Sequence, residues 1–377
     1  MTVDALSETI GHNIMPTIRP LQALLLYYPV VCVTHKSFRE YVQNSKKCES
    51  RFLAKEPQSI TATMPERPNL YTGFPLRRLA TIQAYPGVER AATDVGVQID
   101  PDSISSQPVA RGAYGDIYRA RYTDGLEVAI KSLRIYNGSD ASHEHQAEKD
   151  TVRELLIWSR LDHPNVLSLL GICVLNGEIA MVSEWMPNDN VREYSRKNPS
   201  VNKLGLIADI VAGLKYLHEE HIAHGDLKGE NVVVSAARKC ILVDFGLAKL
   251  CEESLGISSR SANGTMRWLA PELMDIDSNT RTSITGASDI YALGMTALEI
   301  LTGKFPFSEY ERDVCVVKAV GVEHKIPERP SPEAAPELSD TLWELLNSCW
   351  SHRYMERPSA VELEGEISEL INVANSA

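Results

Sequence analysis

Cysteine pairs, surplus positive charge and long apolar runs are all scarce in this sequence of 377 residues. The seven cysteines are irregularly spaced and include no Cys-x-x-Cys pair. Because an odd, scattered set argues against a disulfide framework, we expect reduced thiols in an intracellular, cytoplasmic protein. Acidic residues outnumber basic ones, 50 to 38, which gives a formal net charge of -12. That balance argues against a protein that binds the phosphate backbone of nucleic acids.

The longest apolar run, at residues 21–33, is too short to cross a membrane. A spanning helix needs about 20 apolar residues, and Pro29 interrupts this run. Acidic residues and prolines precede it and no small-residue cleavage site follows, so we expect neither a signal peptide nor a transmembrane segment. A buried helix is the favoured interpretation, with a membrane-surface segment as the alternative.

Composition changes twice along the chain. Residues 1–56 combine the apolar run with a basic, polar stretch, which indicates an N-terminal helical and basic region of unknown role. Residues 57–103 are rich in proline and have few periodic segments, which indicates a linker or an extended packing arm. Strand and helix patterns then follow in good order over residues 104–371, where we expect one folded domain.

Strand patterns come first in that domain, and helical patterns dominate later. Residues 116–122 and 126–133 alternate or are rich in β-branched side chains, as strands should be. Residues 201–221 have apolar side chains at helical spacing, and residues 289–303 are apolar on nearly all faces, which predicts a buried helix. This order predicts an α+β fold with two lobes, a small β-rich one and a larger, mainly helical one.

A glycine-rich turn, ARGAYGDIYRA, lies at residues 110–120. Glycine has no Cβ, so backbone amides in such a turn can approach phosphate groups closely. Ala110 stands where a G-x-G-x-x-G pattern has its first glycine, whereas Gly112 and Gly115 keep the other two. Taken alone, such a turn is more often only a hairpin.

Lys131 lies in the middle of an apolar strand pattern, where an unpaired ammonium group would be expensive to bury. Glu154, in the helical pattern that follows, can neutralise it, and the pair could hold the α- and β-phosphates of a nucleotide. The alternative is a surface lysine on an edge strand. The motifs downstream favour the first interpretation.

Two of those motifs, HGDLKGEN and VDFG, carry the residue types that phosphoryl transfer requires. The reaction needs positioning, metal ions and charge neutralisation more than covalent chemistry. Asp226 can accept the proton of a substrate hydroxyl, and Lys228 can balance charge on the transferred phosphoryl group. Asn231 and Asp244 offer the oxygen ligands that Mg²⁺ prefers. Each residue alone could belong to an ordinary turn, but their order and spacing indicate a phosphotransferase.

Residues 104–371 resemble a eukaryotic protein-kinase domain of the tyrosine-kinase-like group, with glycine in place of the catalytic-loop arginine. The glycine turn, VAIK, HPN, HGDLKGEN, DFG, APE, SDIYALG and CWSHRYMERPS occur in the family's order and separation. The resemblance implies an N-lobe at 104–183, a hinge at 184–190 and a C-lobe at 191–371. It also implies ATP as a ligand, with Mg²⁺, or Mn²⁺ in its place, as the metal.

Roles for single residues follow from the same resemblance. The catalytic residues would be Asp226, Lys228, Lys131 and Glu154, and the metal ligands would be Asn231 and Asp244. The nucleotide would be bound by Ala110, Gly112, Gly115, Ile117, Ala129, Lys131, Ser183, Glu184, Met186 and Asn190. In that set Ser183 would be the gatekeeper, the backbone of Glu184 and Met186 would bind adenine, and Asn190 would lie near the ribose. Asp289 would cap the catalytic loop, and Glu272 would pair with Arg357.

The substrate class follows from motifs that point in two directions. Lys228 and the segment GTMRWLAPE resemble serine/threonine kinases, whereas LDHPNVLSLLGIC and SEWMPN also resemble tyrosine kinases. We expect a protein serine/threonine kinase of intracellular signalling, with ATP and protein substrates as its partners and no nucleic acid. A dual-specificity or tyrosine kinase is an alternative.

Gly225 replaces an arginine that in many kinases grips the phosphorylated activation loop through bidentate charge-assisted bonds. Since that arginine takes no part in transfer, we expect an active kinase that depends weakly on activation-loop phosphorylation. Trp158, one turn after Glu154, stands where the family usually has a smaller apolar residue. Its ring could fix that helix in place, hold it out, or simply fill the core.

Two other functions stay open. A pseudokinase scaffold would bind nucleotide and partners without catalysis, but such proteins usually lack the catalytic Asp, the metal-binding Asp or the strand Lys, and all three are present here. Alternatively, the N-terminal hundred residues could act as an adaptor or a peripheral membrane module, because the apolar run is followed by basic residues that suit an acidic lipid surface. A truncation that lacks residues 1–100 and keeps full activity and localisation would remove this second idea.

Overall fold

The structure is a computed structural model, and it describes residues 95–111, 115–133, 155, 157–176, 178–245, 265–274 and 284–376. The chain separates into two units, residues 1–64 and 65–377, and all described residues belong to the second. The predictions for residues 1–56, for Gly112 and for Glu154 therefore lie outside the described residues.

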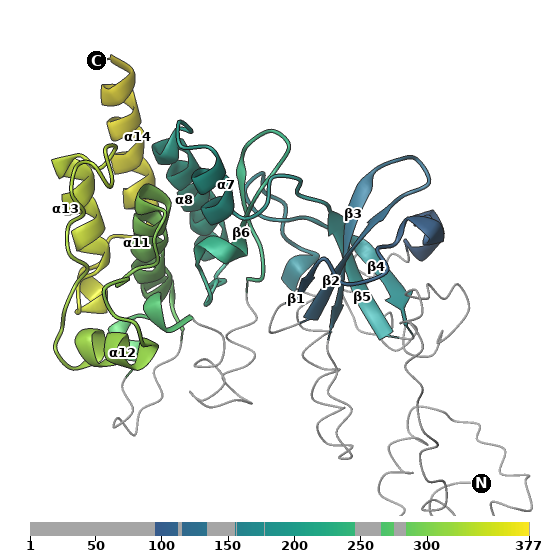
Figure 1. The fold of residues 1–377 in the computed structure, drawn as a ribbon, viewed down its shortest axis with the longest axis horizontal. Helices are drawn as coiled ribbons and strands as arrows, with labels where there is room; N and C mark the ends of the chain where they lie inside the picture. Colours follow the sequence, from purple (N-terminus) through teal and green to yellow (C-terminus); the bar gives the residue numbers. More distant parts are fainter. Residues whose placement is uncertain are drawn as a thin grey trace, which may run out of the picture. The chain divides into compact units, whose positions relative to one another are not determined.

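The strands of the first part form a five-stranded antiparallel sheet in the order β1-β2-β3-β5-β4 (Figure 1). They are β1 (Ala110–Arg111), β2 (Gly115–Arg121), β3 (Glu127–Leu133), β4 (Leu169–Leu175) and β5 (Glu178–Glu184). The alternating and β-branched patterns in β2 and β3 suit a pleated, half-buried surface. The two strands expected from these patterns are confirmed.

Strand register gathers several predicted nucleotide residues on one face of the sheet. Ile117 lies opposite Lys131, and Ala129 lies opposite Ser183. Paired residues share a face, and side chains alternate along a strand, so these four residues point to the same side. The pairing of β2, β3 and β5 thus brings together residues that are distant in the sequence, such as Ile117 and Ser183, which are 66 positions apart.

The other face of the sheet is covered by the segment that precedes β1. Its backbone is tied to the sheet, because Asp100 N donates to Arg121 O at 2.8 Å and Val95 N donates to Ile172 O at 2.9 Å. The apolar cluster on this face contains Val95, Ile99 and Ile104 with Tyr118, Ala120, Tyr122, Val128, Ile130, Cys173, Leu175, Ala180 and Val182. Residues 95–103 therefore pack as an arm, whereas the role of the whole segment 57–103 stays a prediction.

Helices are the main regular elements of the described chain after β5 (Figure 1). They are α7 (Val191–Lys197), α8 (Lys203–Glu219), α11 (Gly286–Thr302), α12 (Asp313–Gly321), α13 (Asp340–Cys349) and α14 (Ala360–Ser376), with a hairpin of β6 (Val232–Val234) and β7 (Cys240–Leu242). The expected α+β fold, with a β-rich part followed by a mainly helical one, is confirmed. Within the described ranges, no helix has the length and apolar character that crossing a membrane would require.

Helix α11 is the centre of the helical part, and every residue from Ser288 to Leu301 is buried. A capping box of Thr285 and Ser288 starts the helix, and Gly303, with φ +68°, ends it in the left-handed conformation that glycine adopts at low cost. The helix packs against α7, α8 and α13 and against the short turn η4 (Gly229–Asn231). The prediction of a buried helix is confirmed.

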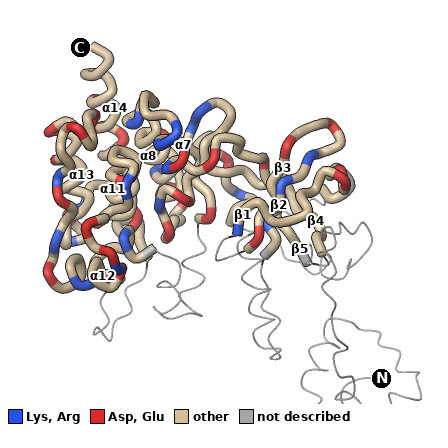
Figure 2. Tube along the Cα trace, viewed as in Figure 1, with Lys and Arg blue, Asp and Glu red and all other residues tan. Residues whose placement is uncertain are grey.

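Basic and acidic residues are interspersed over the described chain (Figure 2). Some of their ion pairs join distant elements, such as Lys215 on α8 with Glu364 on α14 at 2.8 Å. Lys239, just before β7, similarly pairs with Asp209 on α8 at 3.1 Å. These pairs are partly exposed, so each is worth little on its own, and the helical part depends mainly on its apolar core.

Candidate active site

The HGDLKGEN loop holds three predicted site residues, Asp226, Lys228 and Asn231, in one buried cluster. The amide nitrogen of Asn231 donates to Asp226 O at 2.7 Å and to Asp226 Oδ2 at 2.8 Å. Lys228 Nζ lies 3.2 Å from the same Oδ2. The Asp226 carboxylate is therefore oriented by one neutral and one charged donor from its own loop.

Asp244 follows β7 and reaches the sheet through Lys131. Lys131 Nζ donates to Asp244 Oδ1 at 2.8 Å, with the lysine side chain 10% and the carboxylate 28% exposed. Burial alone would raise the pKa of Asp244, but Lys131, with His224 and Lys228, outweighs it and holds that pKa below its usual range. Asp244 has φ +58°, a left-handed backbone conformation that is uncommon for residues other than glycine. This strained conformation sets the direction of the Asp244 side chain.

The predicted nucleotide residues lie as follows. Ala110 pairs with Ile117 on the sheet, and Gly115 pairs with Leu133. Ser183 is buried near the end of β5, and Glu184 is the last residue of that strand, followed by Met186 in the connection to α7. Asn190 is the N-cap of α7, where its side-chain oxygen accepts a hydrogen bond from Glu193 N at 3.0 Å.

The catalytic loop is held at its start by Asp289 of α11. This carboxylate, 2% exposed, accepts hydrogen bonds from His224 N at 2.7 Å and Gly225 N at 2.8 Å. It also contacts His218 Nε2 at 2.9 Å. The cap expected from SDIYALG is therefore confirmed, and Gly225 has φ +80°, a conformation that glycine adopts more easily than other residues.

A second expected pair, Glu272 with Arg357, is also present. Arg357 donates from both terminal nitrogens to the two carboxylate oxygens at 2.7 Å each. Two more of its donors reach Ser351 O at 2.8 Å and Ala287 O at 2.9 Å. Because four of the five guanidinium N–H groups have these acceptors and the side chain is 0% exposed, this pair fixes the APE turn against the start of α11.

Trp158 lies in the apolar core, in the same cluster as Phe245. Its side chain is buried, and its indole N–H donates to Leu167 O. Its ring meets Phe245 of the DFG motif edge-on, with centroids 6.1 Å apart, and Phe245 in turn meets the ring of His224 at 6.5 Å. The core-filling interpretation of this tryptophan accounts for these contacts.

Comparison with known proteins identifies the family of the chain. Residues 105–366 match the protein kinase domain. The chain belongs to the protein kinase family.

Relatives of this kinase include serine/threonine-protein kinase STY46 of Arabidopsis thaliana, 31% identical over 271 residues, which are 70% of this chain and 43% of that one. Ephrin type-A receptor 3 of Danio rerio is 27% identical over 304 residues, 78% of this chain and 29% of the receptor. Dual specificity protein kinase shkC of Dictyostelium discoideum is 28% identical over 282 residues, 73% of this chain and 53% of that one. The chain thus spans about half or less of the length of these relatives.

The donor set of the kinase site fits a divalent metal of the Mg²⁺ type. Asp244 provides a carboxylate whose lowered pKa keeps it ionised at neutral pH. Asn231 uses its amide nitrogen on Asp226, which leaves the amide oxygen with no donor among the described residues. Two hard oxygen ligands, one of them charged, are what a cation that also binds phosphates and water needs from the protein.

Sequence motifs missed one residue of the site, Glu299 on α11. Its side chain is 0% exposed, and its Oε2 accepts a hydrogen bond from Gly229 N at 3.0 Å. Burial raises the pKa of Glu299 to about 7, although the Gly229 N–H and the guanidinium of Arg192 lower it. The one available signal was a glutamate inside an otherwise apolar helix, which always needs a partner.

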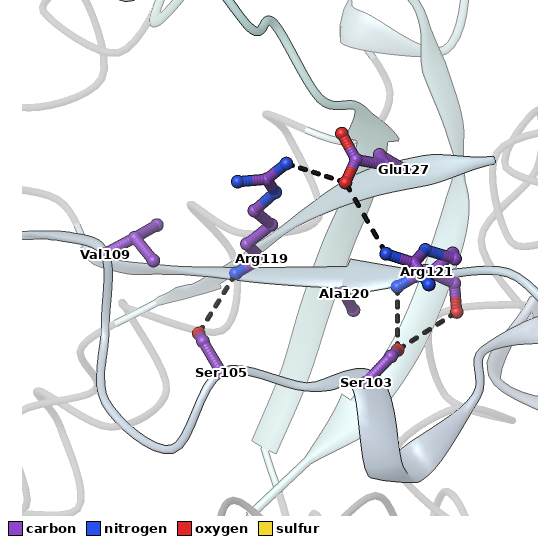
Figure 3. Close-up of a pocket in the computed structure, with 7 residues that line it drawn as sticks. All are labelled: Ser103, Ser105, Val109, Arg119, Ala120, Arg121 and Glu127. Carbon is purple, nitrogen blue, oxygen red and sulfur yellow. Dashed lines mark hydrogen bonds and ion pairs between the residues drawn. The ribbon is translucent and has the colours of Figure 1, made fainter. Parts of the chain in front are cut away.

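A separate pocket of about 300 Å³ is lined by residues that precede β1 and by residues of β2 and β3, and by none of the HGDLKGEN loop (Figure 3). Its polar groups already bond one another, because Ser105 Oγ accepts from Arg119 N at 3.2 Å and Ser103 Oγ accepts from Arg121 N at 2.8 Å. Arg119 pairs with Glu127 at 2.6 Å across the same pocket. These contacts hold the segment before β1 against the sheet, so the pocket is part of the interface between the two.

Proposed function

We propose that the chain is an intracellular protein serine/threonine kinase that transfers the γ-phosphoryl group of ATP to hydroxyl groups of protein substrates. The observation that carries this proposal is the cluster of Asp226, Lys228 and Asn231 beside the Lys131–Asp244 pair, joined through the bond of Val243 N to Asn231 O at 3.0 Å. Phosphoryl transfer asks a protein mainly for positioning and charge neutralisation, and these five residues supply both.

Asp226 is proposed as the group that accepts the substrate proton. Its Oδ2 is held by Asn231 and Lys228, so the carboxylate has a fixed direction before the substrate arrives. The substrate hydroxyl would attack the γ-phosphorus while its proton passes to Asp226 and ADP leaves. Lys228 stands next to the same oxygen, where its charge can stabilise the transferring phosphoryl group.

Lys131, Asn231 and Asp244 are proposed to hold the nucleotide. Lys131 reaches Asp244 from β3, so its ammonium group lies next to one proposed metal ligand, on the sheet face that also bears Ile117 and Ala129. Asn231 and Asp244 would hold Mg²⁺, which would supply positive charge to neutralise the phosphates. The partly buried Lys131–Asp244 pair holds both groups at 2.8 Å from each other, where these contacts would form.

Serine and threonine are favoured as substrates because Lys228 is present and because relatives include a kinase named for serine/threonine activity. Another relative is named for dual specificity, so the labelled residue has to be identified. We expect the purified chain to transfer labelled phosphate from ATP to a basic protein as phosphoserine and phosphothreonine, read by phosphoamino-acid analysis. Phosphotyrosine as the sole product would contradict the assignment.

Gly225 supports the proposal that activity depends weakly on activation-loop phosphorylation. Glycine offers no side chain to bind a phosphorylated loop, and its backbone is already fixed by Asp289 at 2.8 Å. We expect phosphatase treatment to change kcat by less than about threefold, because no charge-assisted contact at this position is lost. Mass spectrometry confirms removal of the phosphates, and Gly225→Arg serves as the variant that regains a charged side chain. A tenfold or larger drop in the wild type (roughly one charge-assisted bond) would contradict this account.

A further inference from the structure

Helix α11 presents two buried carboxylates to the catalytic loop, one at each end of it. Asp289 binds the start of the loop through His224 N and Gly225 N. Glu299, nearly three turns further along the helix, binds the other end, because its Oε2 accepts from Gly229 N at 3.0 Å. Gly229 follows Lys228 directly and starts the short turn that ends at Asn231.

The contact between Glu299 and Gly229 leaves no space for a side chain at position 229. A Cβ built on Gly229 would lie 2.7 Å from Glu299 Oε2 and 2.9 Å from Oε1, closer than real Cβ atoms approach other atoms. Position 229 has ordinary backbone angles, so the glycine is not required by its conformation. A side chain at position 229 therefore fits only if the end of the Glu299 side chain moves.

Glu299 is an expensive residue to bury, which sets it apart from the apolar residues around it. Its nearest cation, Arg192 on α7, places Nε 3.8 Å from Oε1, and neither atom has a hydrogen-bond partner among the described residues. An imperfectly paired carboxylate weakens the core relative to an apolar side chain of similar size. The bond to Gly229 N is the strong contact that this residue makes.

Arg192 extends the same group of contacts to the rim of the site. Its guanidinium lies 3.5 Å from Glu230 Oε1, the residue between Gly229 and Asn231, and 4.6 Å above the ring of Phe305. The end of the catalytic loop is thereby tied to α7 and to the chain that follows α11.

We propose that Glu299 is a positioning residue of the catalytic loop, which fixes the peptide between Lys228 and Asn231 by accepting the N–H of Gly229. The inference rests on the proposed kinase function. The N–H bond sets where Lys228 Nζ and the Asn231 amide stand relative to Asp226 Oδ2, which both of them contact. A shift of about 1 Å in such a cluster is enough to slow a reaction by on the order of 10²-fold.

A double-mutant cycle tests this pair. Gly229→Ala, Glu299→Ala, the double variant and Glu299→Gln are compared with the wild type for kcat and KM in phosphate transfer. We expect Gly229→Ala to lower kcat by roughly 10- to 100-fold, because its Cβ must displace the carboxylate. In the Glu299→Ala background the same change should cost less than about twofold, because the obstacle is gone.

The glutamine variant separates the hydrogen bond from the charge. Glu299→Gln keeps an oxygen that accepts from Gly229, so kcat should stay within about threefold of the wild type, whereas Glu299→Ala should lose about tenfold. Affinity for ADP in the absence of Mg²⁺, measured by calorimetry, should be the same within about twofold in every variant, since a general folding defect would lower it as well. Thermal melting of each variant confirms that the protein is folded.

Three outcomes decide the matter. The inference would be overturned if Gly229→Ala lowered kcat by the same factor with and without Glu299. A Glu299→Gln variant as slow as Glu299→Ala would also overturn it, since the carboxylate charge and not the N–H bond would then matter. A wild type no more active than Asp226→Asn would overturn the proposed function first and this inference with it.

Discussion

Asp244→Asn is expected to abolish phosphate transfer while the protein stays folded. The change removes the carboxylate proposed as the charged metal ligand and puts a neutral amide in its place, where the structure has Oδ1 2.8 Å from Lys131 Nζ. Loss of metal-assisted charge stabilisation is worth several kcal/mol in the transition state, so kcat should fall by about 10³-fold or more. Labelled transfer at saturating ATP, repeated over a range of Mg²⁺ concentrations, measures the effect.

The matched control for this variant is Asp340→Asn on α13. Asp340 also forms an ion pair, with Arg329 at 2.5 Å, but its side chain is 85% exposed and it lies outside the site. Its activity and its requirement for Mg²⁺ should equal those of the wild type. An Asp244→Asn protein that keeps more than about a tenth of wild-type kcat would contradict the role proposed for Asp244.

Asp289→Ala should lower both stability and activity, because one carboxylate satisfies three donors at the start of the catalytic loop. Without it, His224 N, Gly225 N and the His218 ring lose their acceptor in a site that is nearly closed to water. Unpaired buried donors of this kind cost about 3–5 kcal/mol together, or roughly 10 °C in melting temperature for a domain of this size. Since Asp226 is displaced as well, kcat should fall by on the order of 10²-fold.

Thr296→Val is the control for this second prediction. Thr296 is also a buried polar residue of α11, but its hydroxyl donates only to Ala292 O of its own helix at 2.8 Å. Its replacement should shift the melting temperature by a few degrees at most and leave kcat unchanged. Equal melting temperatures for Asp289→Ala and the control would show that α11 does not hold the loop.

Much of the fold could be predicted because its patterns are local. The alternation of side chains in β2 and β3 and the apolar character of α11 on all sides are visible in short stretches of sequence. Each pattern is enough to indicate a strand or a buried helix. The N-terminal arm could be predicted only as one of two alternatives. Prolines before residue 104 left a linker and an extended packing arm both open. Bonds of residues 95–103 to β2 and β4, which no local pattern contains, decide for an arm in that stretch.

The same distinction applies within the site. Asp226, Lys228, Asn231 and Asp244 belong to two short motifs, and Asp289 to a third, so their spacing alone indicated a common site. The hydrogen bond of Glu299 joins residues 70 positions apart and belongs to none of these motifs. A lone glutamate in an apolar helix indicates that a partner exists, but only the packing of α11 under the loop identifies Gly229 as that partner.

The most direct test of the kinase proposal is labelled phosphate transfer from ATP and Mg²⁺ by the wild type and by Asp226→Asn, with autophosphorylation and a basic protein as substrates. Removal of the proton acceptor should cost on the order of 10²- to 10⁴-fold. The account predicts label on serine and threonine that disappears in the variant, with nucleotide affinity the same in both. Equal, near-zero label in both proteins, with ATP still bound, would contradict it and favour a pseudokinase scaffold.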